Sequence, residues 1–231
     1  SRIDRSSTTL TISDLFVIAE QLGCVWKLEK LCRNKALKAA VEKPENVKLF
    51  LNVDGNIIQD KAFIQGFTNR KAMKAGVPAS DIVFEITERS DIENYQILQQ
   101  IMKHYADQGY EIALDDVGAG HSGLNRVVNT TPDYLKADIE LVRDIHKYKK
   151  KEIMMKLLLD YCNATGAILI AEGIETVQEL ECLHSLGVHY GQGFFLGKPE
   201  RAFGNISAES EEILERLNGR KNILFLDISG K

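Results

Sequence analysis

Polar side chains that bind metal ions or phosphate recur along this chain where short apolar runs end. They are Asn52, Glu85, Glu88, Asp115, Asp116, Lys136, Asp138, Glu172, Glu175 and Gln192. A single Asp pair such as Asp115 and Asp116 is weak evidence, because Asp often caps loops and helices. The same polar ending on five apolar runs is not explained by capping, and it predicts one shared site.

The residue types at these positions favour a site for hard divalent cations. Clustered carboxylates repel one another unless a cation is present, and oxygen ligands without paired His or Cys favour Mg²⁺ or Mn²⁺ over Zn²⁺. Two such ions bridged by an Asp stabilise the attacking water and the leaving oxygen of a displacement at phosphorus. The pattern therefore predicts two Mg²⁺ or Mn²⁺ ions and cleavage of a phosphodiester.

Lys136 has two interpretations in such a cluster. It neutralises the acids structurally, or it orients the attacking water and balances developing phosphoryl charge. Among so many acids, we favour the second.

The apolar runs alternate with amphipathic patterns of helical spacing, which is typical of parallel strands joined by crossover helices. The predicted strands are Val47–Val53, Ile82–Thr87, Glu111–Asp115, Tyr134–Asp138, Ala167–Ala171 and Gly193–Leu196. The predicted helices are Ser13–Gly23 with Ser13 as N-cap, Asp91–Gln108, Leu141–Ala164 and Ser207–Leu217. This order predicts an α/β fold, a TIM-like (β/α)8 barrel, whose C-terminal strand ends meet on one face.

The limits of the barrel follow from where this rhythm starts and stops. No strand pattern precedes the first predicted helix, so a closed barrel needs a strand upstream of Ser1. We expect an N-terminally incomplete barrel over residues 1–203, and a C-terminal helix and strand extension or linker over 204–231.

Composition narrows the environment and the partners. The 231 residues carry a net charge of −4, and the one basic run, Lys147 to Lys151, is more typical of a solvated helix face than of a nucleic-acid surface. No apolar stretch reaches the roughly 18 residues of a spanning helix. We expect no nucleic-acid polymer as partner, no membrane contact by this segment, and a cytoplasmic location.

Six ordered motifs resemble those of the EAL-domain phosphodiesterases, which linearise cyclic di-GMP. The motifs are Leu51-Asn52-Val53, Phe84-Glu85-Ile86-Thr87-Glu88, Leu114-Asp115-Asp116-Val117-Gly118-Ala119-Gly120, Leu135-Lys136-Ala137-Asp138, Ala171-Glu172-Gly173-Ile174-Glu175 and Gln192-Gly193-Phe194. The resemblance covers roughly Ser1 to Pro199. It implies an eight-stranded barrel with one strand antiparallel to the rest, dependence on Mg²⁺ or Mn²⁺, and a linear dinucleotide product.

The resemblance also implies roles for individual residues. Those matching metal ligands are Asn52, Glu85, Asp115 and Asp116. Glu172 resembles a further ligand or the base for the attacking water, and Lys136 the residue that positions this water. Those matching substrate contacts are Arg2, Asp138, Glu175 and Gln192, with Arg2 at a phosphate. Glu88 resembles the glutamate that anchors the loop after the Asp pair.

Two features of the chain bear on this match. If Arg2 is aligned correctly, the Glu-Ala-Leu signature falls immediately before Ser1. The loop after the Asp pair has Ala119 and His121 where the family more often has Thr and Tyr, which we interpret as variation among active members.

Two functions compete on these residues. The first is hydrolysis of cyclic di-GMP to linear 5′-pGpG in bacterial second-messenger signalling. The alternative is a catalytically inactive cyclic di-GMP receptor that regulates a fused or partner domain. Because a receptor is free to lose Lys136, the Asp pair or Glu172, their presence favours the enzyme. The resemblance also implies a homodimer and a fused sensory or GGDEF-type domain outside this segment. Such a fused domain could tether the protein to a membrane.

Overall fold

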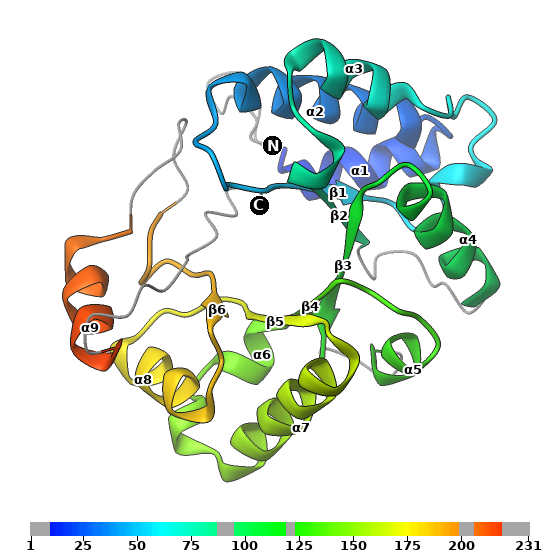
Figure 1. Ribbon diagram of the computed structural model, residues 1–231. Coiled ribbons are helices and arrows are strands. Elements are labelled where there is room, and N and C mark those ends of the chain that lie inside the picture. The colour runs from blue at the N-terminus through cyan, green and yellow to red at the C-terminus, as the bar shows by residue number, and fades with distance from the viewer. Residues whose placement is uncertain (1–9, 87–94, 119–122, 199–205, 219–231) are drawn as a thin grey trace. The chain divides into compact units, whose positions relative to one another are not determined.

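The computed structural model describes residues 10–86, 95–118, 123–198 and 206–218 (Figure 1). The chain divides into two compact units, with the boundary between Glu111 and Ile112. Each unit has its own strands and helices, and each carries part of the predicted site.

In its described residues, the first unit pairs two parallel strands with four α-helices and three short 3-10 helices, labelled η. Its elements are α1 (Ile12–Gln21), α2 (Val25–Ala39), η1 (Ala40–Glu42), β1 (Leu49–Val53), η2 (Ile57–Gln59), α3 (Phe67–Ala75), η3 (Ala79–Asp81), β2 (Ile82–Ile86) and α4 (Tyr95–Ala106). The two strands run in register from Leu49 opposite Ile82 to Val53 opposite Ile86. Helix α2 packs against α1, α3 and β1. Every residue of β2 is buried, as expected for a strand covered on both faces.

A buried ion pair lies in the core of the first unit. Arg33 forms an ion pair with Glu29, and both side chains are 2% exposed. Three aromatic rings surround the guanidinium, with centroids 5.0 to 5.6 Å from its carbon atom. Glu29 Oε1 also accepts the backbone N–H of Asp54 at 2.6 Å, just after β1. The pair therefore ties α2 to the end of a strand that carries a predicted ligand.

The second unit repeats the strand-helix order around four parallel strands. Its elements are β3 (Glu111–Val117), α5 (Gly123–Val128), β4 (Tyr134–Ala137), α6 (Ile139–Val142), η4 (Ile145–Lys147), α7 (Lys149–Thr165), β5 (Ile168–Ala171), α8 (Val177–Leu186), β6 (Tyr190–Gly191) and α9 (Ala208–Asn218). Strand β3 pairs with β4, β4 with β5 and β5 with β6, all parallel. Helix α7 packs on β5 and on α8 (Figure 1). The carboxyl ends of these four strands therefore lie at one edge.

Five of the six predicted strands are confirmed, and the sixth is misplaced. The expected strand at Gly193–Leu196 is wrong, because the strand is β6 and the chain turns immediately after it. A Cβ on Gly193 would lie 2.1 Å from the carbonyl oxygen of Ile174, so this glycine sits directly against another backbone. The apolar residues after Gly193 fill a packed turn, and their composition alone does not distinguish this from a strand.

Two predicted helix features also need correction. The N-cap of α1 is Thr11, since its hydroxyl accepts the backbone N–H of Asp14 and the Asp14 carboxylate accepts that of Thr11. The predicted helix Leu141–Ala164 is three helical elements, α6, η4 and α7, and the first break lies at Asp144, whose φ of 57° leaves the helical path. A continuous apolar spacing across the break concealed it in the sequence.

The predicted C-terminal helix is confirmed as α9, which packs on α8. Ser207 and Ser210 donate their hydroxyls to the carbonyl of Phe195, and Leu214 is buried. The division of the chain at residue 203 stays a prediction. None of the helices in the described ranges has the length and apolarity needed to cross a membrane.

Candidate metal centre

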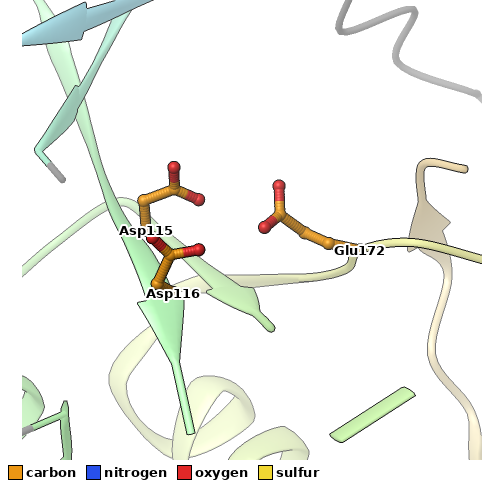
Figure 2. Close-up of side chains that lie close together, drawn as sticks. All are labelled: Asp115, Asp116 and Glu172. Carbon is orange, nitrogen blue, oxygen red and sulfur yellow. The ribbon is translucent and has the colours of Figure 1, made fainter. Parts of the chain in front are cut away.

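The two consecutive aspartates at the end of β3 share one side of the strand because the strand is irregular there. Neighbouring residues in a regular strand point to opposite faces. Asp116 has a φ of 57°, and the register with β4 shifts between Leu114 and Val117. Asp tolerates this left-handed conformation better than most residues. The distortion lets Asp115 and Asp116 direct both carboxylates into the same space (Figure 2).

Glu172 completes a cluster of three acids. It follows β5 directly, and a carboxylate oxygen from each of Asp115, Asp116 and Glu172 lies within 4.8 Å of the others. Figure 2 shows the Glu172 carboxylate turned toward the Asp pair from the neighbouring part of the sheet. Asp115 and Glu172 are buried, so water screens their mutual repulsion poorly.

Lys136 projects from β4 into this cluster. Its Nζ lies 3.0 Å from Asp115 Oδ1 and 2.5 Å from Glu172 Oε1, and its side chain is 1% exposed. Three carboxylates and one ammonium leave two formal negative charges in a cluster of which only Asp116 is partly exposed. A divalent cation would balance these charges.

Gln192 adds an amide at the same place, immediately after β6. Its Nε2 donates a hydrogen bond to Glu172 Oε1, and its buried Oε1 has no hydrogen-bond partner among the described residues. Buried polar atoms are normally satisfied, so this oxygen points to a group that the described residues do not supply. The donor set is oxygen only, without His or Cys, and it fits a hard cation such as Mg²⁺ or Mn²⁺.

The predicted ligands of the first unit also form a pair. Asn52 on β1 is the register partner of Glu85 on β2, so their side chains leave the same face of the two strands. Glu85 is 3% exposed in an otherwise apolar strand. Their role as metal ligands stays a prediction.

Two predicted substrate contacts have structural partners of their own. Asp138 is the N-cap of α6, and its carboxylate accepts the backbone N–H of Glu140 at 2.7 Å. Glu175 forms an ion pair with Arg143 at 3.1 Å, and both side chains are largely exposed. Neither belongs to the three-acid cluster found among the described residues. Their substrate contacts stay predictions.

The remaining residues named in the predictions lie outside the described part of the chain. They are Arg2, Glu88, Ala119 and His121.

Sequence reasoning missed Glu179, the third residue of α8. Its carboxylate accepts three backbone N–H groups, from Asp144 at 2.8 Å, Glu175 at 2.9 Å and Thr176 at 3.0 Å. Burial raises the pKa of this carboxyl, but the hydrogen bonds from these donors outweigh burial and leave the pKa below its usual value. The Thr-x-x-Glu spacing of a capping box was the available signal.

A family comparison decides what kind of domain this is. The profile of the EAL domain matches residues 1–199. The chain belongs to the EAL domain family. The resemblance inferred from the motifs at the strand ends is therefore confirmed at the level of the family.

Several curated relatives of this EAL domain carry the name cyclic di-GMP phosphodiesterase. The cyclic di-GMP phosphodiesterase PdeA of Borreliella burgdorferi is 25% identical over 201 residues, covering 85% of this chain and 30% of that protein. The cyclic di-GMP phosphodiesterase PdeR of Escherichia coli K12 is 28% identical over 160 residues, covering 68% of this chain and 24% of that protein. The chain thus spans less than a third of the length of these relatives.

Solved structures confirm the TIM-like α/β fold class of the EAL domain. BlrP1 of Klebsiella pneumoniae, in a calcium and cyclic di-GMP complex, superposes with a TM-score of 0.73 at 28% identity, covering 79% of this chain and 47% of that chain. A standalone EAL protein of Vibrio cholerae O395, bound to cyclic di-GMP, gives a TM-score of 0.72 at 27% identity, and the match covers 80% of this chain and 78% of that chain.

Proposed function

We propose that this EAL domain hydrolyses cyclic di-GMP to linear 5′-pGpG in bacterial second-messenger signalling. The observation that carries the proposal is the buried cluster of Asp115, Asp116 and Glu172 with Lys136 Nζ inside it. A barrel that only binds partners has no use for acids held so close together. The named activity of the relatives supplies the substrate class.

The cluster residues have separate roles in this proposal. Asp115, Asp116 and Glu172 hold Mg²⁺ or Mn²⁺, with Asn52 and Glu85 as the further ligands that the family resemblance implies. When bound, the ions supply Lewis-acid polarisation of a phosphate oxygen and of water.

Lys136 and Glu172 act on the attacking water. Lys136 Nζ, fixed by two carboxylates, orients the water oxygen toward phosphorus and balances developing charge. Glu172 takes the water proton as general base. The new bond joins the water oxygen to phosphorus, the bond from phosphorus to O3′ breaks, and O3′ takes a proton from solvent. The product is therefore a linear dinucleotide with a 5′-phosphate.

The proposal extends to partners and location. We propose that Arg2, Asp138, Glu175 and Gln192 contact the substrate and that Glu88 anchors the loop after the Asp pair. The homodimer, the fused sensory or GGDEF-type domain and the cytoplasmic location belong to the same proposal, and they rest on the family.

A hydrolysis assay tests the function and distinguishes it from the receptor alternative. The full-length protein is incubated with cyclic di-GMP and Mn²⁺, and separately with EDTA, and linear product is followed by chromatography. We expect metal-dependent appearance of 5′-pGpG. Tight binding of cyclic di-GMP without turnover would instead identify a receptor.

Two lysine variants make the assay specific to the cluster. Lys136→Ala removes the buried ammonium, and we expect it to lower kcat while sparing metal binding. Lys103→Ala is the matched control, because Lys103 is exposed and forms its ion pair with Asp107 at the surface. Equal turnover in the two variants would exclude Lys136 from the reaction.

A further inference from the structure

Glu179 lies where two segments that carry site residues meet. One segment follows β4 and leads from Lys136 through the short helix α6 to Asp144. The other follows β5 and leads from Glu172 to Glu175. Strands β4 and β5 pair directly, and the N–H of Glu172 donates to the carbonyl of Ala137 at 3.0 Å, so the sheet sets the backbone beneath the ion pair of Lys136 and Glu172. The two segments set the path of the chain just beyond it.

The Glu179 carboxylate joins the segments through its two oxygens. Oε1 accepts the N–H of Asp144 at 2.8 Å on the first segment. Oε2 accepts the N–H of Glu175 at 2.9 Å and of Thr176 at 3.0 Å on the second. An ordinary capping box needs only the Thr176 bond, so the other two bonds go beyond helix capping. The residue is 3% exposed, which protects these bonds from competition by water.

Two neighbouring contacts show that the segments are packed against each other. Gly173 has a φ of 71°, and a Cβ there would lie 2.3 Å from a side-chain carbon of Ile139 on α6. At the surface, Arg143 forms an ion pair with Glu175. Arg143 directly precedes Asp144, and the N–H groups of Asp144 and Glu175 both donate to Glu179. Asp144 has a left-handed backbone with a φ of 57°, a conformation that needs support in a non-glycine residue.

We propose that Glu179 is a positioning residue that fixes Glu172 and Glu175 relative to Lys136 by tying the two segments together. Its effect on turnover rests on the proposed phosphodiesterase function, whereas its effect on the geometry of the acid cluster does not. Groups that hydrogen-bond to metal ligands commonly change metal affinity or activity by about 10- to 100-fold when they are replaced. Glu179 acts through the backbone N–H of Glu175, three residues after Glu172, so the low end of this range is expected.

Two variants separate this role from helix capping. Glu179→Gln keeps the size of the side chain, but its amide has one oxygen and one NH₂ group, so at least one backbone N–H meets a donor. Thr176→Ala is the matched control: it removes the hydroxyl that accepts the N–H of Glu179 at 3.3 Å, and leaves the three bonds to the carboxylate intact.

Three measurements are made on the full-length protein and both variants. They are Mn²⁺ affinity by calorimetry without substrate, deuterium uptake of the peptide covering residues 172–176 without metal, and kcat and KM for cyclic di-GMP. For Glu179→Gln we expect about tenfold weaker Mn²⁺ binding, faster exchange and a lower kcat with little change in KM. Thr176→Ala should match the wild type in Mn²⁺ affinity and kcat.

The outcomes separate this inference from the proposed function. Equal Mn²⁺ affinity and equal exchange in the two variants would overturn the positioning role, whatever the wild type hydrolyses. A wild type that does not hydrolyse cyclic di-GMP would overturn the enzyme proposal. In that case weaker Mn²⁺ binding in Glu179→Gln, but not in Thr176→Ala, would still support the positioning role.

Discussion

Removing the carboxylate of Glu29 should destabilise the first unit strongly. The change Glu29→Ala leaves the Arg33 guanidinium buried without its anionic partner, although Thr68 and Tyr105 still accept its hydrogen bonds at 3.1 and 3.0 Å. It also deprives the N–H of Asp54 of its acceptor.

The size of the effect follows from the burial of both charges. Breaking a buried ion pair by removing one partner costs about 3 to 5 kcal/mol. For a chain of this length, each kcal/mol lowers the melting temperature by about 2 to 4 °C, so a fall of about 6 to 20 °C is expected. Urea unfolding followed by circular dichroism measures the change in free energy.

Two comparisons make this prediction refutable. Lys103→Ala breaks an exposed pair of the same i,i+4 spacing and should cost at most about 1 kcal/mol. Replacing Glu29 and Arg33 together by Met should be much less harmful than Glu29→Ala, since no unpaired charge remains. If the free energy of unfolding of Glu29→Ala lies within about 1 kcal/mol of that of the wild type, the unpaired buried charge of Arg33 does not destabilise the first unit as argued.

Three further predictions concern the second unit and the ligands. Asp115→Asn should weaken Mn²⁺ binding and turnover together, as should Glu85→Gln; unchanged affinity in both by calorimetric titration would reject the ligand assignment. Burial raises the pKa of the Cys162 thiol from 9.0 to about 11. The neutral thiol therefore adds stability below pH 9 that is lost as the pH rises to about 11, and the free energy of unfolding of the wild type relative to Cys162→Ala should fall by at most about 2 to 3 kcal/mol over that range. A constant difference in urea unfolding would contradict this. Gly193→Ala places a Cβ 2.1 Å from the carbonyl oxygen of Ile174, so we expect the free energy of unfolding to fall by about 3 kcal/mol. We also expect a lower kcat, because the change displaces the neighbouring Gln192. A melting temperature like that of the wild type would show that the backbone shifts to accommodate the Cβ.

The sequence by itself determined the fold class and most of the strands. Apolar runs alternating with helical spacing are local patterns, and they indicate parallel strands wherever they repeat. Because parallel strands place their carboxyl ends at one edge, Asp115, Lys136 and Glu172 were predicted to meet, and the structure brings them together. This part of the site needed only residue types and their position relative to each strand.

Local patterns were insufficient where neighbouring segments set the backbone. The left-handed conformation of Asp144 divides a stretch whose apolar spacing is continuous, and the close approach of Gly193 to Ile174 turns the chain where apolar residues suggested a strand. Both depend on contacts between residues far apart in the sequence, which periodicity does not contain.

Only the tertiary structure revealed how the site residues are held. The left-handed backbone of Asp116 directs two consecutive carboxylates to one side, against the alternation of a regular strand. Glu179 accepts the N–H of Asp144, 35 residues away, a bond that its capping-box spacing does not predict. The sequence thus predicted which groups gather at the strand ends, whereas the packing of distant segments decided their orientation, because hydrogen bonds between loops depend on the folded backbone.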